Sequence, residues 1–276
     1  AYMFKIEIEG KTILHTGDFR AHGYTGYVLE KVLRYYVKQV DILITEGTML
    51  GRKNEVVLLE ADIEKNVAEA LRKSKYVYAL CSSTYIDRIR ALHNSCKVTR
   101  RTFVCDSYQY SVLDIFNKYT LSERYKFNRV FKLINYKTKN VYQKLSHTGF
   151  LVMVRPSSYS RIKRMMCTYN DQPSALIYSM WQGYHNGTPE QINKDIVKIR
   201  QLFGGNIYDG TRDGFHTSGH ASVETLQMVC RCVKPRLGIV PIHKDANTSF
   251  KNLPIADDYC IIESDVVIDN INIRVR

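Results

Sequence analysis

Acidic and imidazole side chains occur at four points where an apolar run of the sequence ends or a glycine precedes them. Asp18 and His220 each directly follow a glycine, whereas Glu46 and His243 each end an apolar run. Carboxylates and imidazoles are the groups that bind divalent metals in proteins. Open α/β sheets bind their ligands at the carboxyl ends of the strands. The pattern therefore predicts that these four residues lie together at one sheet edge and bind a metal or a phosphate.

The charge of the sequence indicates a polyanionic partner. The 40 Lys and Arg exceed the 27 Asp and Glu, giving a formal net charge of +13, which attracts nucleic acid. Residues 118–144 hold eight Lys or Arg against the single Glu123. Aromatic residues that could stack on unpaired bases are interleaved with them: Tyr119, Tyr125, Phe127, Phe131, Tyr136 and Tyr142. The alternative is that this region forms two ordinary amphipathic elements, whose aromatic side chains pack in the core and whose lysines are solvated.

Length and composition favour a folded protein without a membrane span. With 276 residues and 45% hydrophobic content, the chain is expected to form one large or two intimate domains. Its apolar runs fall short of the roughly 20 residues that a membrane span requires, and the first residues do not resemble a signal peptide. The number of cysteines is seven, which is odd, whereas a disulfide framework typically has an even number. We therefore expect reduced thiols, a cytoplasmic location and no membrane partner.

The order of strand-like and helix-like patterns predicts an inserted domain. Residues 4–15 predict a hairpin, because apolar and polar residues alternate up to a glycine turn. Helical and strand patterns then alternate up to about residue 205, which is typical of a parallel, doubly wound α/β sheet. Short strands return after residue 206. The expected domains are 1–55 and 206–276, which together form one domain, with 56–205 inserted between them.

A helix is also predicted over residues 27–39. Its expected apolar face consists of Val28, Val32, Tyr35 and Tyr36.

The motif residues resemble the β-CASP branch of the metallo-β-lactamase superfamily, which includes ribonuclease J and the cleavage and polyadenylation endonuclease. His-Thr-Gly-Asp-Phe-Arg at 15–20 is similar to the fourth metallo-β-lactamase motif. Glu46, Ser218-Gly219-His220-Ala221 and Pro241-Ile242-His243 are similar to the first, second and third β-CASP motifs. The resemblance covers essentially the whole chain. It implies a partial metallo-β-lactamase αββα sandwich with an inserted, parallel, doubly wound β-CASP domain.

The resemblance also implies roles for these residues. Asp18 would coordinate two zinc ions and His243 one of them. His220 would contact the scissile phosphate and act as a proton donor, and Glu46 would orient a neighbouring histidine. The implied reaction is attack of a metal-activated water on a phosphodiester. An imidazole in the third motif resembles the RNA-cleaving members, so RNA is the expected substrate.

Further phosphate or RNA contacts are expected beside these motifs. Ser83 and Thr84 follow a predicted strand and are similar to a serine-bearing turn that contacts phosphate in ribonuclease J; the alternative is a plain helix N-cap. His216, Ser218 and Gly219 are the other candidates.

The sequence departs from the family in lacking most of the metal ligands. No His-x-His or His-x-x-His pair occurs in it. We therefore expect the chain alone to hold little or no zinc and to be inactive. Two explanations fit: a truncated nuclease, or a piece whose missing N-terminal half comes from another chain. A non-catalytic RNA-binding or scaffolding paralogue is the alternative function. The exposed edge of the opening hairpin further predicts self-association into a homodimer.

Overall fold

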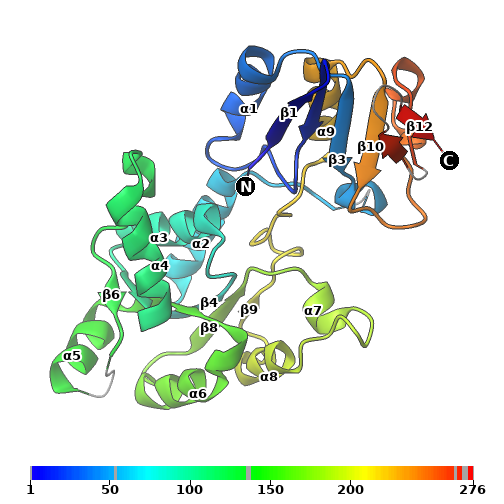
Figure 1. Cartoon of the computed structure of the whole chain (residues 1–276). Coiled ribbons are helices and arrows are strands. Elements are labelled where there is room, and N and C mark those ends of the chain that lie inside the picture. Colours follow the sequence, from blue (N-terminus) through cyan, green and yellow to red (C-terminus); the bar gives the residue numbers. More distant parts are fainter. Residues whose placement is uncertain (1, 53–54, 135–137, 264–265, 269–272, 276) are drawn as a thin grey trace. The chain divides into compact units, whose positions relative to one another are not determined.

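A computed structural model describes residues 2–52, 55–134, 138–263, 266–268 and 273–275 (Figure 1). The chain forms two compact units, and each is treated separately. Unit 1 comprises Ala1–Val57 and Ser218–Arg276, and unit 2 comprises Leu58–Thr217. The domain limits expected from the sequence fall after residues 55 and 205. The assignment of the units to named domains stays a prediction.

Unit 2 contains a six-stranded sheet in the order β6-β5-β7-β4-β8-β9, and all of its strand pairs are parallel. The central strands are buried along their whole length, as expected where helices cover both faces of a sheet. The strands of this sheet are β4 (Tyr76–Leu80), β5 (Thr102–Cys105), β6 (Phe131–Lys132), β7 (Phe150–Val154), β8 (Ser174–Tyr178) and β9 (Ile207–Tyr208).

Helices cover this sheet on both sides, as Figure 1 shows. One core combines Ile63, Leu92 and Leu113 with one face of the sheet, and a second core combines Leu145 and Ile162 with the other face. Right-handed crossovers explain this division, because connections that run in opposite directions along a parallel sheet place their helices on opposite faces. The unit 2 helices are α2 (Glu60–Lys73), α3 (Ile86–Thr99), α4 (Ser107–Tyr119), α5 (Lys139–Thr148), α6 (Tyr159–Thr168), α7 (Gly183–Asn186) and α8 (Lys194–Phe203). The expected α/β class with parallel strands is confirmed.

Unit 1 contains a four-stranded sheet in the order β1-β2-β3-β10. β1 and β2 form an antiparallel hairpin, whereas β2, β3 and β10 run parallel. The strands are β1 (Phe4–Ile8), β2 (Lys11–His15), β3 (Ile42–Glu46) and β10 (Gly238–Ile242). α9 (Val223–Val233) packs on β3, and a separate antiparallel pair is formed by β11 (Val266–Ile268) and β12 (Ile273–Val275).

The predicted helix over 27–39 exists as α1 (Leu29–Val32) continued by a π-helical turn, Leu33–Val37. Its predicted apolar face was wrong. Val28, Val32, Tyr35 and Tyr36 are exposed, and the segment instead packs Leu29, Leu33 and Val37 into the core. Both faces carry apolar residues at helical spacing, so periodicity could not choose between them.

Short 3-10 turns occur in both units, at Gly26–Val28, Thr48–Gly51, Glu123–Tyr125, Pro156–Ser158, Phe250–Asn252 and Ala256–Asp258.

Two further expectations concern the environment of the chain. Among the described residues, no helix has the length and apolar content needed to cross a bilayer. All seven cysteines are free thiols. The cytoplasmic location stays a prediction.

Three of the aromatic side chains of residues 118–144 make contacts within the fold. Phe127 is buried, and Tyr125 donates a hydrogen bond to Asp87 at 2.6 Å. Tyr142 stacks on Tyr169 with ring centroids 5.5 Å apart. Tyr136 lies outside the described residues, and Tyr119 is well exposed.

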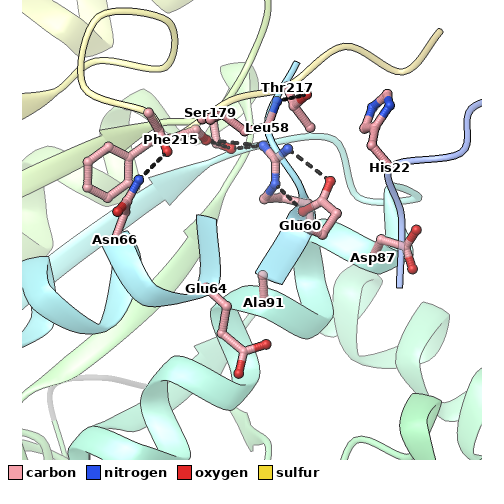
Figure 2. A network of polar contacts seen from close by, with 12 residues as sticks. His22, Leu58, Glu60, Glu64, Asn66, Asp87, Ala91, Ser179, Phe215 and Thr217 are labelled. Atoms are coloured by element: carbon pink, nitrogen blue, oxygen red, sulfur yellow. Dashed lines mark hydrogen bonds and ion pairs between the residues drawn. The ribbon is translucent and has the colours of Figure 1, made fainter. Parts of the chain in front are cut away.

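A fully buried ion pair joins the helices of unit 2 to the segment that leaves it (Figure 2). Arg88 on α3 donates two hydrogen bonds to the Glu60 carboxylate on α2, at 2.8 and 3.0 Å. Its remaining amino group donates to the Ser179 hydroxyl and to the Phe215 carbonyl. Next to this network, the Leu58 amide donates to the Thr217 hydroxyl at 3.1 Å. The entry and exit of the unit 2 chain therefore lie side by side.

We predict that Arg88→Met destabilises the protein by about 3–5 kcal/mol, because it leaves the Glu60 carboxylate buried without its partner. The Arg88→Met, Glu60→Leu double variant should lose much less, since no buried charge remains. Urea unfolding measures both. Arg34→Met, which removes an exposed ion pair with Glu30, is the control and should have no measurable effect. A loss for Arg88→Met as small as that control would contradict the interpretation.

The hairpin strand β1 is an edge strand with an exposed apolar face. Phe4, Ile6 and Ile8 are 60%, 45% and 54% exposed. Lys5 and Glu7 alternate with them and form an ion pair at 2.6 Å. Antiparallel pairing of two such strands about Ile6 would place Lys5 of each strand opposite Glu7 of the other, an arrangement of favourable cross-strand pairs.

We therefore predict concentration-dependent self-association through β1, which Ile6→Lys should weaken by placing two like charges opposite each other. Size-exclusion chromatography with light scattering over a range of concentrations measures the effect. A clean monomer at high concentration for the unmodified chain would refute the prediction.

Candidate metal centre

The parallel strands of unit 1 bring their carboxyl ends to one edge of the sheet. In the register of these strands, His15 at the end of β2 lies beside Ile44, and Ile242 at the end of β10 lies beside Glu46. His243 directly follows β10. Because parallel strands share this edge, the residues that follow them gather there although the sequence separates them widely.

The Glu46 carboxylate connects two loops of the site. Its side chain is fully buried, and Oε1 accepts hydrogen bonds from the amides of Phe19 at 2.9 Å and Ala221 at 3.2 Å. Oε2 contacts His220 Nδ1 at 2.8 Å. One carboxylate thereby holds the loop that follows Asp18 and the loop that carries His220. The resemblance implies that Glu46 orients a neighbouring histidine. His220 is the histidine that it contacts, and the role itself stays a prediction.

Asp18 and His243 contact each other directly. Asp18 Oδ1 lies 2.7 Å from His243 Nδ1, and both side chains are about half exposed. The rings of His243 and His220 have centroids 5.2 Å apart. His243 has a φ of 46°, a left-handed conformation that costs a non-glycine residue energy and often occurs at functional sites. The Thr48 hydroxyl helps to hold it by donating to the His243 carbonyl at 3.0 Å.

The donor set fits a single divalent cation. Ligand atoms of Asp18, His220 and His243 all lie within 4.8 Å of one another, and no other such group of His, Cys, Asp or Glu occurs among the described residues. Two imidazoles and one carboxylate are a common set for catalytic zinc. Since Nδ1 of His220 is held by Glu46, its Nε2 is the nitrogen with a lone pair for a metal. The sequence predicts Asp18 and His243 as ligands, and a potential ligand atom of His220 lies in the same cluster.

The same contacts change the acidity of His220. The hydrogen bond to Glu46 raises the pKa of the imidazole above its ordinary 6.5, and the negative charges of Glu46 and Asp18 act in the same direction. Burial and the charge of Arg52 oppose the effect without reversing it. His220 therefore retains a proton to a higher pH than a free histidine does.

The loop of His220 contains two of the expected phosphate contacts. Ser218 is buried, and its hydroxyl accepts from the His220 amide at 3.2 Å. Gly219 is exposed, with open space where a side chain would be. These two residues thus share the loop of the metal centre, with Gly219 on its open side.

Ser83, Thr84 and His216 belong to unit 2 and are described within it. Neither Ser83 nor Thr84 caps α3, whose N-cap is Tyr85 without a side-chain hydrogen bond. The Ser83 carbonyl accepts from the Gln109 side chain at 3.1 Å, and the His216 amide donates to the Gly210 carbonyl at 2.9 Å. Their roles as phosphate contacts stay predictions.

One residue that positions the site had no role in the sequence analysis. His22 is buried, and its Nε2 lies 2.7 Å from the Ser218 carbonyl, so the imidazole braces the loop before His220. The partners are 196 residues apart in the sequence. The only sequence signal is the closeness of His22 to Asp18.

Comparisons with known proteins leave the family of the chain open. No protein-family model matches it, and no curated protein matches it significantly. The resemblance to β-CASP hydrolases therefore stays a prediction from the motif residues.

We predict that Glu46→Gln lowers the pKa of His220 towards 6.5 and destabilises the chain by about 1.5–3 kcal/mol, the range for hydrogen bonds to a charged group. Because the folded pKa is raised, the stabilisation is fully present below pH 6.5 and is lost as pH rises through the folded value. NMR titration of the imidazoles and urea unfolding at several pH values measure both effects in metal-free protein. Glu30→Gln on exposed α1 is the control. An unchanged His220 titration in Glu46→Gln would contradict the assignment.

Proposed function

We propose that this chain is the C-terminal part of a zinc-dependent RNA phosphodiesterase of the β-CASP type. The observation that carries the proposal is the convergence of Asp18, Glu46, His220 and His243 on one sheet edge. These residues come from four distant stretches, and their types match the motif residues of that family. A buried acid that orients a histidine beside candidate ligands is an arrangement typical of metal-dependent hydrolases.

Each of these residues would have a separate role in the proposed reaction. Asp18 and His243 would hold zinc, which when bound supplies an activated water and stabilises charge on phosphate oxygens. Glu46 fixes the ring of His220, and the raised pKa of that ring keeps a proton available for a leaving oxygen. His220 could instead complete the ligand set, since its ligand atom lies within the same cluster.

RNA is proposed as the substrate because of charge and motif. The formal net charge of +13 favours encounter with a polyanion. The imidazole of His243 occupies the third motif, as in RNA-cleaving members of the family.

The described ligands suffice for one cation, whereas the family site has two. We therefore propose that the isolated chain does not cleave RNA and that cleavage requires an N-terminal half carrying the His-x-His-x-Asp-His motif.

A non-catalytic RNA-binding or scaffolding paralogue is the second candidate. The direct contact of 2.7 Å between Asp18 Oδ1 and His243 Nδ1 supports it, because this contact pairs one atom of each side chain without a cation.

We predict that the isolated chain binds zinc only weakly, at about one ion per chain, in keeping with the expectation from the sequence. Asp18→Asn or His243→Asn should weaken this binding at least ~10-fold, which is the smallest effect usual for losing a residue that supports a metal site. Titration calorimetry with zinc measures the affinity. Asp257→Asn, which removes an exposed acid of unit 1, is the matched control. Equal zinc affinity for Asp18→Asn and the control would refute the metal centre.

RNA cleavage is then measured with the chain alone and with the N-terminal half supplied. Cleavage that appears only with that half, and that Asp18→Asn abolishes, supports the phosphodiesterase. Tight RNA binding without restored cleavage supports the paralogue.

A further inference from the structure

Unit 2 has a basic hollow at the amino ends of β5 and β6, the opposite edge of its sheet from the turn that carries Ser83. Its volume is about 630 Å³. The hollow exists because β6 pairs only with the second half of β5, Val104 with Phe131, and leaves the start of β5 uncovered. The end of α3, the segment 128–131 and one residue of α5 form the remaining walls.

The charges around this hollow all have one sign. Five cationic side chains line it, and no described Asp or Glu does. They are Lys97, Arg100, Arg101, Arg129 and Lys144. Like charges gathered around one space repel each other, and a bound anion would offset that repulsion.

Two of the arginines occupy backbone conformations that an arginine does not favour. Arg100 has a φ of 56° and Arg129 has a φ of 61°. Arg100 is the left-handed residue that ends α3, a position where glycine is the usual choice. Keeping a long cationic side chain at these two positions has an energetic cost, and such residues cluster at functional sites.

The floor of the hollow is neutral and already hydrogen-bonded. His93 is buried, with its Nε2 2.7 Å from the Asn128 carbonyl. Burial lowers the pKa of His93, the hydrogen bond to the Asn128 carbonyl opposes this effect, and the charge of Lys97 acts in the same direction as burial. A ligand would therefore meet fixed positive charge on the walls rather than a titrating group on the floor.

We propose that this hollow binds a compact anion bearing several phosphate groups. The volume lies within the 300–1,000 Å³ usual for small-molecule sites, and arginine is the side chain best suited to phosphate. A stretched RNA strand fits less well, because the aromatic rings at the hollow are not free platforms for bases. Phe103 is buried, and Lys144 covers the Phe131 ring with its Nζ 4.8 Å from the centroid.

Inorganic tripolyphosphate is the probe that tests the proposal. Calorimetric titration of the full chain at low salt should show binding that weakens as salt is raised. Arg100→Gly and Arg129→Gly should each weaken binding roughly tenfold or more, because each removes a charge-assisted contact. Arg100→Gly should leave the urea midpoint unchanged or raise it, since glycine suits the left-handed position. The affinity for tripolyphosphate and the urea midpoint should therefore change independently of each other.

The matched control is Lys163→Gln, Arg164→Gln on the exposed side of α6, which removes two charges from the same unit. It should leave tripolyphosphate binding almost unchanged. An equal loss in the control and the hollow variants would overturn the proposal, as would no tripolyphosphate binding at low salt. A third result would also overturn the proposal: the chain binds single-stranded RNA but not tripolyphosphate, and Arg100→Gly weakens the RNA binding. That result would favour a surface that binds an RNA strand. Zinc binding at Asp18 is a separate measurement, so either proposal can fail alone.

Discussion

The fully buried carboxylate of Glu46 is the constraint on which the site of unit 1 depends. A charge taken out of water must be paired, and Glu46 is paired with two backbone amides and one imidazole. The Phe19 amide belongs to the loop after β2, whereas the Ala221 amide and the His220 imidazole belong to the loop before α9. Satisfying one acid therefore fixes the Asp18 loop against the His220 loop. The position of the candidate ligands follows from that requirement.

Unit 2 meets the same requirement with the opposite charge. Arg88 is fully buried, and the Glu60 carboxylate together with the Ser179 and Phe215 oxygens surrounds its guanidinium. In both units a buried ion, not apolar contact alone, decides how loops near the carboxyl ends of the strands are arranged. Such ions restrict the loops to few conformations, because every alternative leaves a charge unpaired.

Those parts of the structure that depend on local pattern could be predicted from the sequence. The strands Tyr76–Leu80 and Phe150–Val154 are continuous apolar runs, so their burial in a parallel sheet was predictable. The meeting of Asp18 with His243 was predictable because both follow strands that run in one direction. The pairs Arg88 with Glu60 and His22 with Ser218 could not be, since each joins elements that only the tertiary structure brings together.

The contact between the Leu58 amide and the Thr217 hydroxyl brings the two ends of unit 2 together. A segment of 160 residues leaves and rejoins its host at almost the same point, so the host needs only a short loop to close the gap. Such an arrangement lets a domain be acquired, exchanged or lost as one cassette without rebuilding the sheet that receives it.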